Sequence, residues 1–333
     1  SVAAAISANL STATTRAHTA DGASIAAEGG LSISSLGNYG TLAKADGSAV
    51  DATSATVGVG AAVAVNQVTA VNEAYVSSGQ YAAQGITIEA KMLPDARAKS
   101  GAEATSGAGS SKVGIAGALA LHVIDSVTAA QIRDGASVNA QGSDVVLTAE
   151  GKSQHKAGAL PDKEGAGGGS VGIGASVALT RLSDMTEASV DETADLLGAN
   201  NLKLSASSDH GTETEARAGA SGGVAVDSVV AVSTLNQRTQ ASIASGNLLV
   251  TSGSIELQAL STGDHKVKAT GDTRSSNVGV GSAVALVTTD NETIALIDRD
   301  LSVAGDIDIS ASATRSYDTS ATASAKGATD TTA

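Results

Sequence analysis

Hydrophobic and small residues alternate with a period of two along a segment that recurs through the chain. Its clearest copy runs from Val57 to Asn66 and reads VGVGAAVAVN. Because successive side chains of a β-strand point to opposite faces, one face of this segment carries mainly Val and the other mainly Gly and Ala. The pattern predicts a strand in which neither face is strongly polar.

This strand opens a repeated unit. Clear copies begin at Val57, Val113, Val171, Val224 and Val278, which are 56, 58, 53 and 54 residues apart, and a weaker copy begins near Ser1. A fixed period predicts a stacked array, since one unit cannot bury its own apolar face. We therefore predict one repeat array over residues 1–333, with copies at approximately 1–56, 57–112, 113–170, 171–223, 224–277 and 278–333. We expect the chain to be an excised part of a much longer protein.

Later parts of the unit also recur at constant offsets. A second strand is marked by an alanine in every copy, namely Ala17, Ala74, Ala130, Ala188, Ala241 and Ala295. A third strand begins with an aliphatic residue in each copy, at Leu31, Ile86, Val145, Leu202, Ile255 and Ile307. Repeated strands without the aromatic signatures of propeller blades favour an all-β, parallel β-solenoid, with about two rungs per copy and helix close to nil.

The opening strand also suggests how the layers pack. We expect its Val face to fill the solenoid interior, and we expect its Gly and Ala stripe to let another sheet approach closely. That second sheet could belong to a second solenoid side by side in the same chain or to another chain, so lateral self-association is among the predicted partners. The alternative is a smooth exposed surface of Gly and Ala. Twelve rungs at about 4.8 Å would give a rod roughly 60 Å long.

Composition narrows the functional classes. The chain has no Trp, Phe or Cys, so its core must be aliphatic and is not held by disulfides. It has 20 Lys and Arg against 34 Asp and Glu, a net charge of −14. That balance argues against nucleic acid, whose phosphates are neutralised by basic residues, and against an anionic membrane surface. No stretch has the ~20 unbroken apolar residues of a membrane-spanning helix, so direct membrane insertion is not predicted.

The repeated motifs carry a resemblance. VGVGAAVAVN (57–66), AYV (74–76) and ITIEA (86–90) resemble the repeats of very large bacterial surface and secreted proteins. These are the haemagglutinin-like and adhesin-like β-helical proteins, including the leukotoxin-type repeats of fusobacteria. The resemblance covers the whole chain and implies export to the bacterial cell surface, neighbouring repeats of a parent protein as partners, and a role in adhesion. It identifies no receptor on a host or neighbouring cell and supplies no catalytic residues.

Candidate catalytic residues are not evident. The five His residues lack the spacings of metal motifs, and no Gly-x-Ser-x-Gly elbow joins a strand to a helix. Four Tyr residues occupy different positions of the repeat, which argues against a stacking platform for sugars. Pro161 and the glycine-rich run 165–169 predict the largest surface loop of the array.

One acidic group could bind a metal. Asp298, Asp300, Asp306 and Asp308 lie close together in the last copy, and Ca²⁺ prefers such oxygen ligands. The positions equivalent to Asp308 are Ser32, Thr87, Val146, Lys203 and Glu256, so no carboxylate ladder recurs. We expect a solvated charge cluster, with calcium as the weaker alternative, and no other metal, cofactor or catalytic residue.

These observations predict a non-catalytic structural and adhesive stalk segment of a large extracellular or cell-surface bacterial protein. Two alternatives remain open. Parallel β-helices also carry polysaccharide lyases and hydrolases, although no cluster of Asp, Arg and Lys on one face is evident here. A phage or virus fibre would also be elongated, but it would be expected to form trimers.

Overall fold

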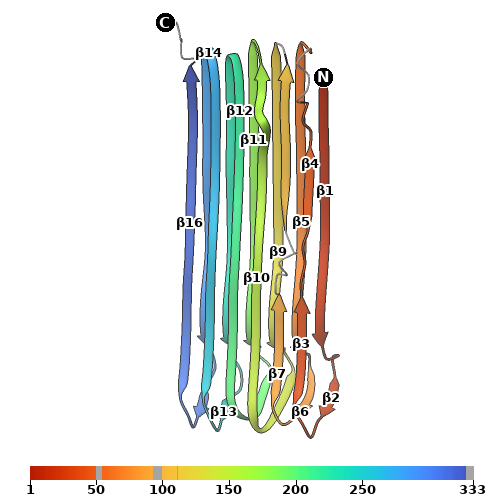
Figure 1. Ribbon diagram of the computed structural model, residues 1–333. Helices are drawn as coiled ribbons and strands as arrows, with labels where there is room; N and C mark the ends of the chain where they lie inside the picture. The colour runs from red at the N-terminus through yellow and green to blue at the C-terminus, as the bar shows by residue number, and fades with distance from the viewer. Residues whose placement is uncertain (50–54, 93–99, 111, 328–333) are drawn as a thin grey trace.

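The computed structural model describes residues 1–49, 55–92, 100–110 and 112–327. Within these residues the chain is all-β, without a helix, and its sixteen strands form one sheet in which every pairing is parallel. Corresponding strands of successive repeats lie side by side, so the two ends of the described chain lie at opposite sides of the array (Figure 1). The predicted fold class is therefore confirmed as all-β and parallel, an arrangement consistent with a β-solenoid.

One layer consists of the long opening strands. We call it the long-strand layer, and its members are β1 (Val2–His18), β5 (Val57–Val76), β9 (Val113–Ile132), β11 (Val171–Val190), residues 224–243 of β12 (Asp195–Ile243) and residues 278–297 of β14 (Ile255–Ile297). Short strands follow at the lower turn in Figure 1, namely β2 (Ala23–Ala26), β6 (Gly79–Ala82), β13 (Leu249–Thr251) and β15 (Leu301–Val303).

The chain then runs back in the opposite direction. The return layer contains β3 (Leu31–Gly37), β4 (Leu42–Asp46), β7 (Ile86–Met92), β8 (Ser100–Ser110), β10 (Ala136–Gly168), the first parts of β12 and β14, and β16 (Ile307–Gly327). β12 and β14 each continue around the upper turn into the next long strand (Figure 1). Each copy thus traces one long loop, which we call a rung.

The strand register follows the sequence repeat. Val57 pairs with Val113, Val113 with Val171, Val171 with Val224 and Val224 with Val278. The six marker alanines also stack in one column, and those of the four inner rungs are fully buried. The pairing therefore places residues that are one repeat length apart in the sequence beside each other in the sheet.

The number of rungs differs from the prediction. Every pairing offset equals a whole repeat, so each copy forms one rung rather than two. Six stacked strands extend over only about 24 Å along the stacking direction, whereas a twenty-residue strand is about 66 Å long. The described array is therefore a slab whose long dimension lies along the strands, and the predicted 60 Å rod is wrong.

The face of the opening strand that points inward also differs from the prediction. Gly58, Gly60, Ala62 and Ala64 are buried, whereas Val57, Val59 and Val63 point outward. The expected close approach of a second sheet is present, but that sheet is the return layer of the same rung. A Cβ atom on Gly58 would lie 2.6 Å from the carbonyl oxygen of Gly109, so only a glycine allows the two backbones to approach so closely.

The core changes character along the strands. Near the upper turn it consists mainly of alanines, which form one cluster with Val229 and Val267. Near the lower turn it contains the bulky side chains of the third strands, including Ile88, Leu147, Leu204 and Leu257. Between these two clusters, buried polar side chains alternate with smaller apolar clusters such as Ile124, Leu182 and Leu235.

The predicted surface loop at 161–169 is mostly strand. β10 continues to Gly168, and its register shifts between Ala159 and Ala166 against β12 and between Pro161 and Ala166 against β8. The extra residues form a β-bulge. Pro161 has no backbone N–H to donate to a neighbouring strand, and a bulge accommodates a short insertion without ending the strand.

Candidate functional site

A cluster of buried polar side chains, contributed by both layers, lies inside the slab. The long-strand layer contributes Asn66, His122 and Asp184, and the return layer contributes Ser153, His155 and His210. All six residues are no more than 6% exposed. Buried polar groups are costly unless they are paired, so their mutual contacts decide whether this region stabilises the fold.

The side chains form a continuous chain of contacts across neighbouring rungs. Asn66 Nδ2 lies 3.3 Å from His122 Nδ1, and His122 Nε2 lies 3.3 Å from His155 Nδ1. His155 Nε2 lies 2.8 Å from Ser153 Oγ, which lies 2.6 Å from His210 Nδ1.

The chain of contacts ends at a buried carboxylate. His210 Nε2 lies 2.7 Å from Asp184 Oδ2, although its N–H is not well aligned for a hydrogen bond. Ser126 and Thr186 also donate hydroxyl hydrogen bonds to Asp184. This carboxylate therefore has three partners within the interior.

One assignment of protons satisfies the whole chain. If each histidine is neutral with its proton on Nε2, Asn66 donates to His122, His122 to His155, and His155 to Ser153. The Ser153 hydroxyl then donates to His210, whose Nε2–H points toward the Asp184 carboxylate. Every donor is directed toward the single negative charge, so the interior needs no protonated histidine.

Ser153, His210 and Asp184 are in the order found in serine hydrolases, where the histidine lies between a hydroxyl and a carboxylate. A hydrolase needs a substrate-accessible nucleophile, and Ser153 is only 6% exposed. Its hydroxyl is also shared with His155. This geometry supports a structural network rather than a catalytic one.

Burial lowers the pKa of two histidines of this network, His122 and His155, and of the nearby His265. Burial lowers the pKa of His122 to about 4, and this effect is partly offset by the backbone carbonyl of Asn66, which would accept a hydrogen bond from Nδ1 of the protonated ring. The pKa of His265, buried further along the return layer, is also lowered to about 4 by burial and by the charges of His210 and Arg315. Burial and the neighbouring histidines lower the pKa of His155 well below its usual value.

Acidification is therefore expected to destabilise the fold between pH 6.5 and pH 4. In this window the unfolded chain binds protons on these histidines and the folded chain does not, so the free energy of unfolding falls as pH falls. For His122 the loss at pH 5 is about 2 kcal/mol, since each pH unit contributes about 1.4 kcal/mol. Burial raises the pKa of Glu187, Asp191 and Asp227, which acts in the opposite direction. Urea unfolding at pH 7 and pH 5 measures the balance.

Variants can separate the histidines from the carboxylates. His122→Asn and His265→Thr install residues that the neighbouring rungs carry in the same columns, Asn66 and Thr212. Both should reduce the loss of stability between pH 7 and pH 5, whereas His18→Asn, at an exposed position, should not. An equal pH dependence in all four proteins would contradict this assignment.

The predicted acidic group lies elsewhere. Asp298, Asp300, Asp306 and Asp308 are exposed around β15 and the start of β16, at the lower turn of the last rung. Among the described residues, no group of three or more Asp, Glu, His or Cys residues is arranged to hold a metal ion. The calcium alternative thus gains no geometric support and stays untested.

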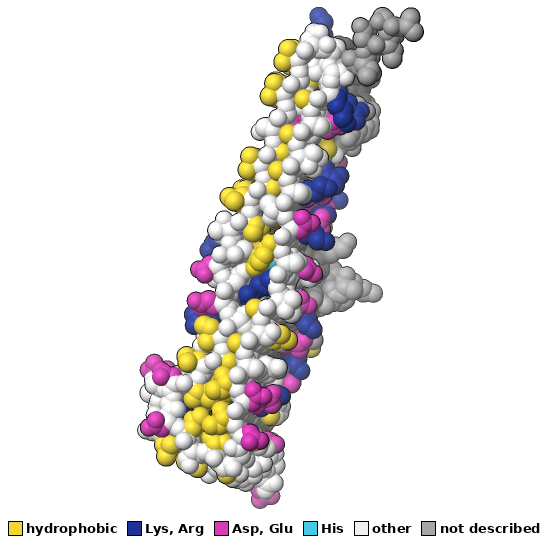
Figure 2. Space-filling view, turned by 90° about the vertical axis from the view of Figure 1, so that its left-hand side faces the viewer, with side chains coloured by type: hydrophobic (Ala, Val, Ile, Leu, Met, Phe, Trp, Pro, Cys, Tyr) yellow, Lys and Arg dark blue, Asp and Glu magenta, His cyan; other side chains and the backbone are white. Residues whose placement is uncertain are grey.

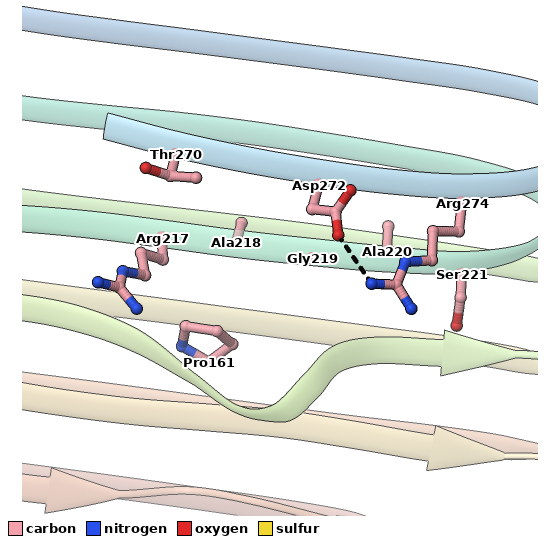
Figure 3. Close-up of a pocket in the computed structure, with 9 residues that line it drawn as sticks. All are labelled: Pro161, Arg217, Ala218, Gly219, Ala220, Ser221, Thr270, Asp272 and Arg274. Atoms are coloured by element: carbon pink, nitrogen blue, oxygen red, sulfur yellow. Dashed lines mark hydrogen bonds and ion pairs between the residues drawn. The ribbon is translucent and has the colours of Figure 1, made fainter. Parts of the chain in front are cut away.

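Two shallow hollows mark the outer surface. One, about 210 Å³, lies beside the bulge at Pro161 and is bordered by Arg217 and Arg274 (Figure 3). Both guanidinium groups already pair with carboxylates, Arg217 with Glu215 and Arg274 with Asp272. The other hollow, about 460 Å³, lies on the long-strand layer and is lined by residues that include Asp125, Arg238 and Glu292.

The sequence contained a signal for the histidine cluster that the search for metal motifs missed. His155, His210 and His265 are 55 residues apart, close to the repeat length, so stacking should bring them together. The register offsets them by two residues, because His155 pairs with Thr212 and Ser153 with His210. His122 joins them from the opposite layer, which no spacing along the chain indicates.

Comparison with family models, curated proteins and solved structures returned no match. The described residues include no helix long and apolar enough to span a membrane.

Proposed function

We propose that this chain is a non-catalytic structural segment of a parallel β-solenoid, acting as a stalk with adhesive surfaces in a large bacterial protein exported to the cell surface. The observation that carries the proposal is the in-register parallel stacking of all six copies, each on the next. Repeats stacked in this way form elongated scaffolds in which each unit contacts only its neighbours.

The two outer rungs support the same proposal. Val2 and Ile6 on β1 are 78% and 81% exposed, whereas Ile115, the counterpart of Val2 in an inner rung, is 37% exposed. At the other end, apolar side chains of the interior are visible between the two layers of the last rung (Figure 2). Open edges of this kind present unpaired backbone groups and apolar surface, and further repeats stacked on both sides would cover them. Neighbouring repeats of a parent protein are therefore the proposed partners at these edges.

Mechanical unfolding tests the stalk function. With handles at the two termini, stretching should give a stepwise record in which each event releases one rung of about 55 residues, or roughly 190 Å of chain. Each event must break a full row of backbone hydrogen bonds, so a clear force maximum should precede it. The unfolding force should be the same with millimolar Ca²⁺ and with a chelator, because the acidic group lies in one rung only.

Two results would count against the proposal. A featureless extension would show that the stacked rungs bear no load. Cleavage of an acidic polysaccharide by the purified chain would favour the lyase or hydrolase class instead.

A further inference from the structure

The two outer surfaces of the slab differ in chemistry. The return layer carries ion pairs along its outer surface, including Lys152–Glu150, Lys203–Glu256 and Arg274–Asp272. The outer surface of the long-strand layer is uncharged over the first half of its strands. Figure 2, which views the slab from its last rung, shows apolar side chains along the upper left edge and charged side chains along the right edge.

In segment 57–65, alternate residues starting at Val57 point outward. We define the aliphatic face as these residues together with the residues that pair with them in segments 2–8, 113–121, 171–179, 224–232 and 278–286. Every one of these residues is Val, Ile, Leu, Ala, Gly or Ser. Even in inner rungs the larger side chains remain accessible, with Ile115 37% and Ile173 39% exposed. Solvated sheet surfaces normally alternate with polar residues, so this face is built to be covered.

We propose that the aliphatic face binds a second copy of the same chain, face to face, so that two slabs form a four-layered sandwich. The proposal concerns an outer surface and does not depend on the stalk function. It differs from the sequence-based expectation of lateral pairing through the Gly and Ala stripe, because that stripe is already covered by the return layer.

The dimensions of the face fit such a dimer. Nine residues of strand, which span eight steps, and six stacked rungs give an area of about 26 Å by 24 Å, or about 600 Å². Stable interfaces bury about 800 Å² per partner, with an apolar centre and a polar rim. The second half of the long-strand layer supplies that polar rim. It contains the larger hollow, which is lined by residues that include Asp125, Arg238 and Glu292.

The shape of the face also fits a copy of itself. The column of Ala61, Gly117, Ala175 and Ser228 forms a shallow groove between ridges of larger residues such as Ile173 and Val177. Two flat parallel sheets with ridges and grooves pack face to face about 10 Å apart. A lipid surface suits the face less well, because the chain has no Trp or Phe and the face carries no Lys or Arg.

The oligomeric state tests the proposal. Light scattering of the wild-type chain at increasing concentration should approach twice the mass of 32.2 kDa. Leu121→Lys together with Val177→Lys should weaken self-association roughly 100-fold, since two charges would be buried without partners. Gln258→Lys, on the exposed outer surface of the return layer, is the matched control and should leave the dimer unchanged.

A distance measurement separates this dimer from end-to-end stacking through the open edges. The chain has no Cys, so one spin label can be placed at Ala175→Cys in the centre of the face. A face-to-face dimer brings the two labels within about 20 Å, whereas end-to-end stacking separates equivalent residues by about 29 Å. A monomer at high concentration, a trimer, a dimer insensitive to the lysines or the longer distance would overturn the proposal. Lysine-sensitive binding of a monomer to phosphatidylcholine vesicles would also overturn it and would assign the face to a lipid surface.

Discussion

Replacing Gly172 with alanine is expected to destabilise the fold by about 1–3 kcal/mol, although it adds a single methyl group. Gly172 lies in the fourth rung, on the glycine stripe through which the two layers approach each other. A Cβ atom there would lie 2.6 Å from the carbonyl oxygen of Ala166 and closer still to that of Ser221. Both obstacles are backbone atoms held in the sheet, so the layers must separate locally to accept the methyl group.

Gly117 provides a matched control in the adjacent rung. It lies on the same kind of long strand but faces outward, and a Cβ atom there would have no neighbour within 4 Å. Gly117→Ala should be neutral or stabilise by about 0.5–1 kcal/mol, because alanine restricts the unfolded chain. Urea unfolding of both variants measures the difference. Equal effects at the two positions would show that the layers are not packed through the glycine stripe.

The sequence predicted the stacking because the repeat aligns like residues. The starts at Val113 and Val171 and the column containing Ala188 are paired as expected, since in-register parallel strands place each residue on its counterpart. The number of rungs that each copy forms could not be predicted in the same way. The return segment 100–110 reads SGAEATSGAGS, which lacks large apolar residues and resembles a loop, although it forms the strand β8.

The orientation of the opening strand could not be deduced from hydrophobicity alone. Valine is usually the buried residue, so the sequence favoured Val63 inside and Ala64 outside. In this fold the glycine stripe lets the backbones of the two layers approach closely, and the side chains between them near the upper turn are mainly Gly and Ala. Valine is thereby left on the outer surface, where the aliphatic face is formed.

Replacing Asp184 with alanine is expected to have the largest effect on stability, about 3 kcal/mol or more, because it removes the shared acceptor of three buried donors, each of which costs about 1–3 kcal/mol when left unsatisfied. The change leaves His210 Nε2 and the hydroxyls of Ser126 and Thr186 without their acceptor in the interior. Water cannot readily replace the carboxylate, since Asp184 is only 4% exposed. The equivalent change of the exposed Asp300 should alter stability by less than about 0.5 kcal/mol.

The same variant tests the direction of the donor chain. In the wild type, ¹⁵N spectra should show His122, His155 and His210 each with a proton on Nε2, since each Nε2–H points along the chain toward Asp184. In Asp184→Asn the side-chain amide can turn its donor toward His210, which would then carry its proton on Nδ1 and donate to Ser153. A reversal at His210 with a milder loss of stability than in Asp184→Ala is the expected result. Protons on Nδ1 in the wild type, or equal losses in Asp184→Ala and Asp300→Ala, would contradict the network. A carboxylate with this role also fixes alignment, because apolar strands with a period of two could slip by two residues, whereas Asp184 finds its partners in one register only.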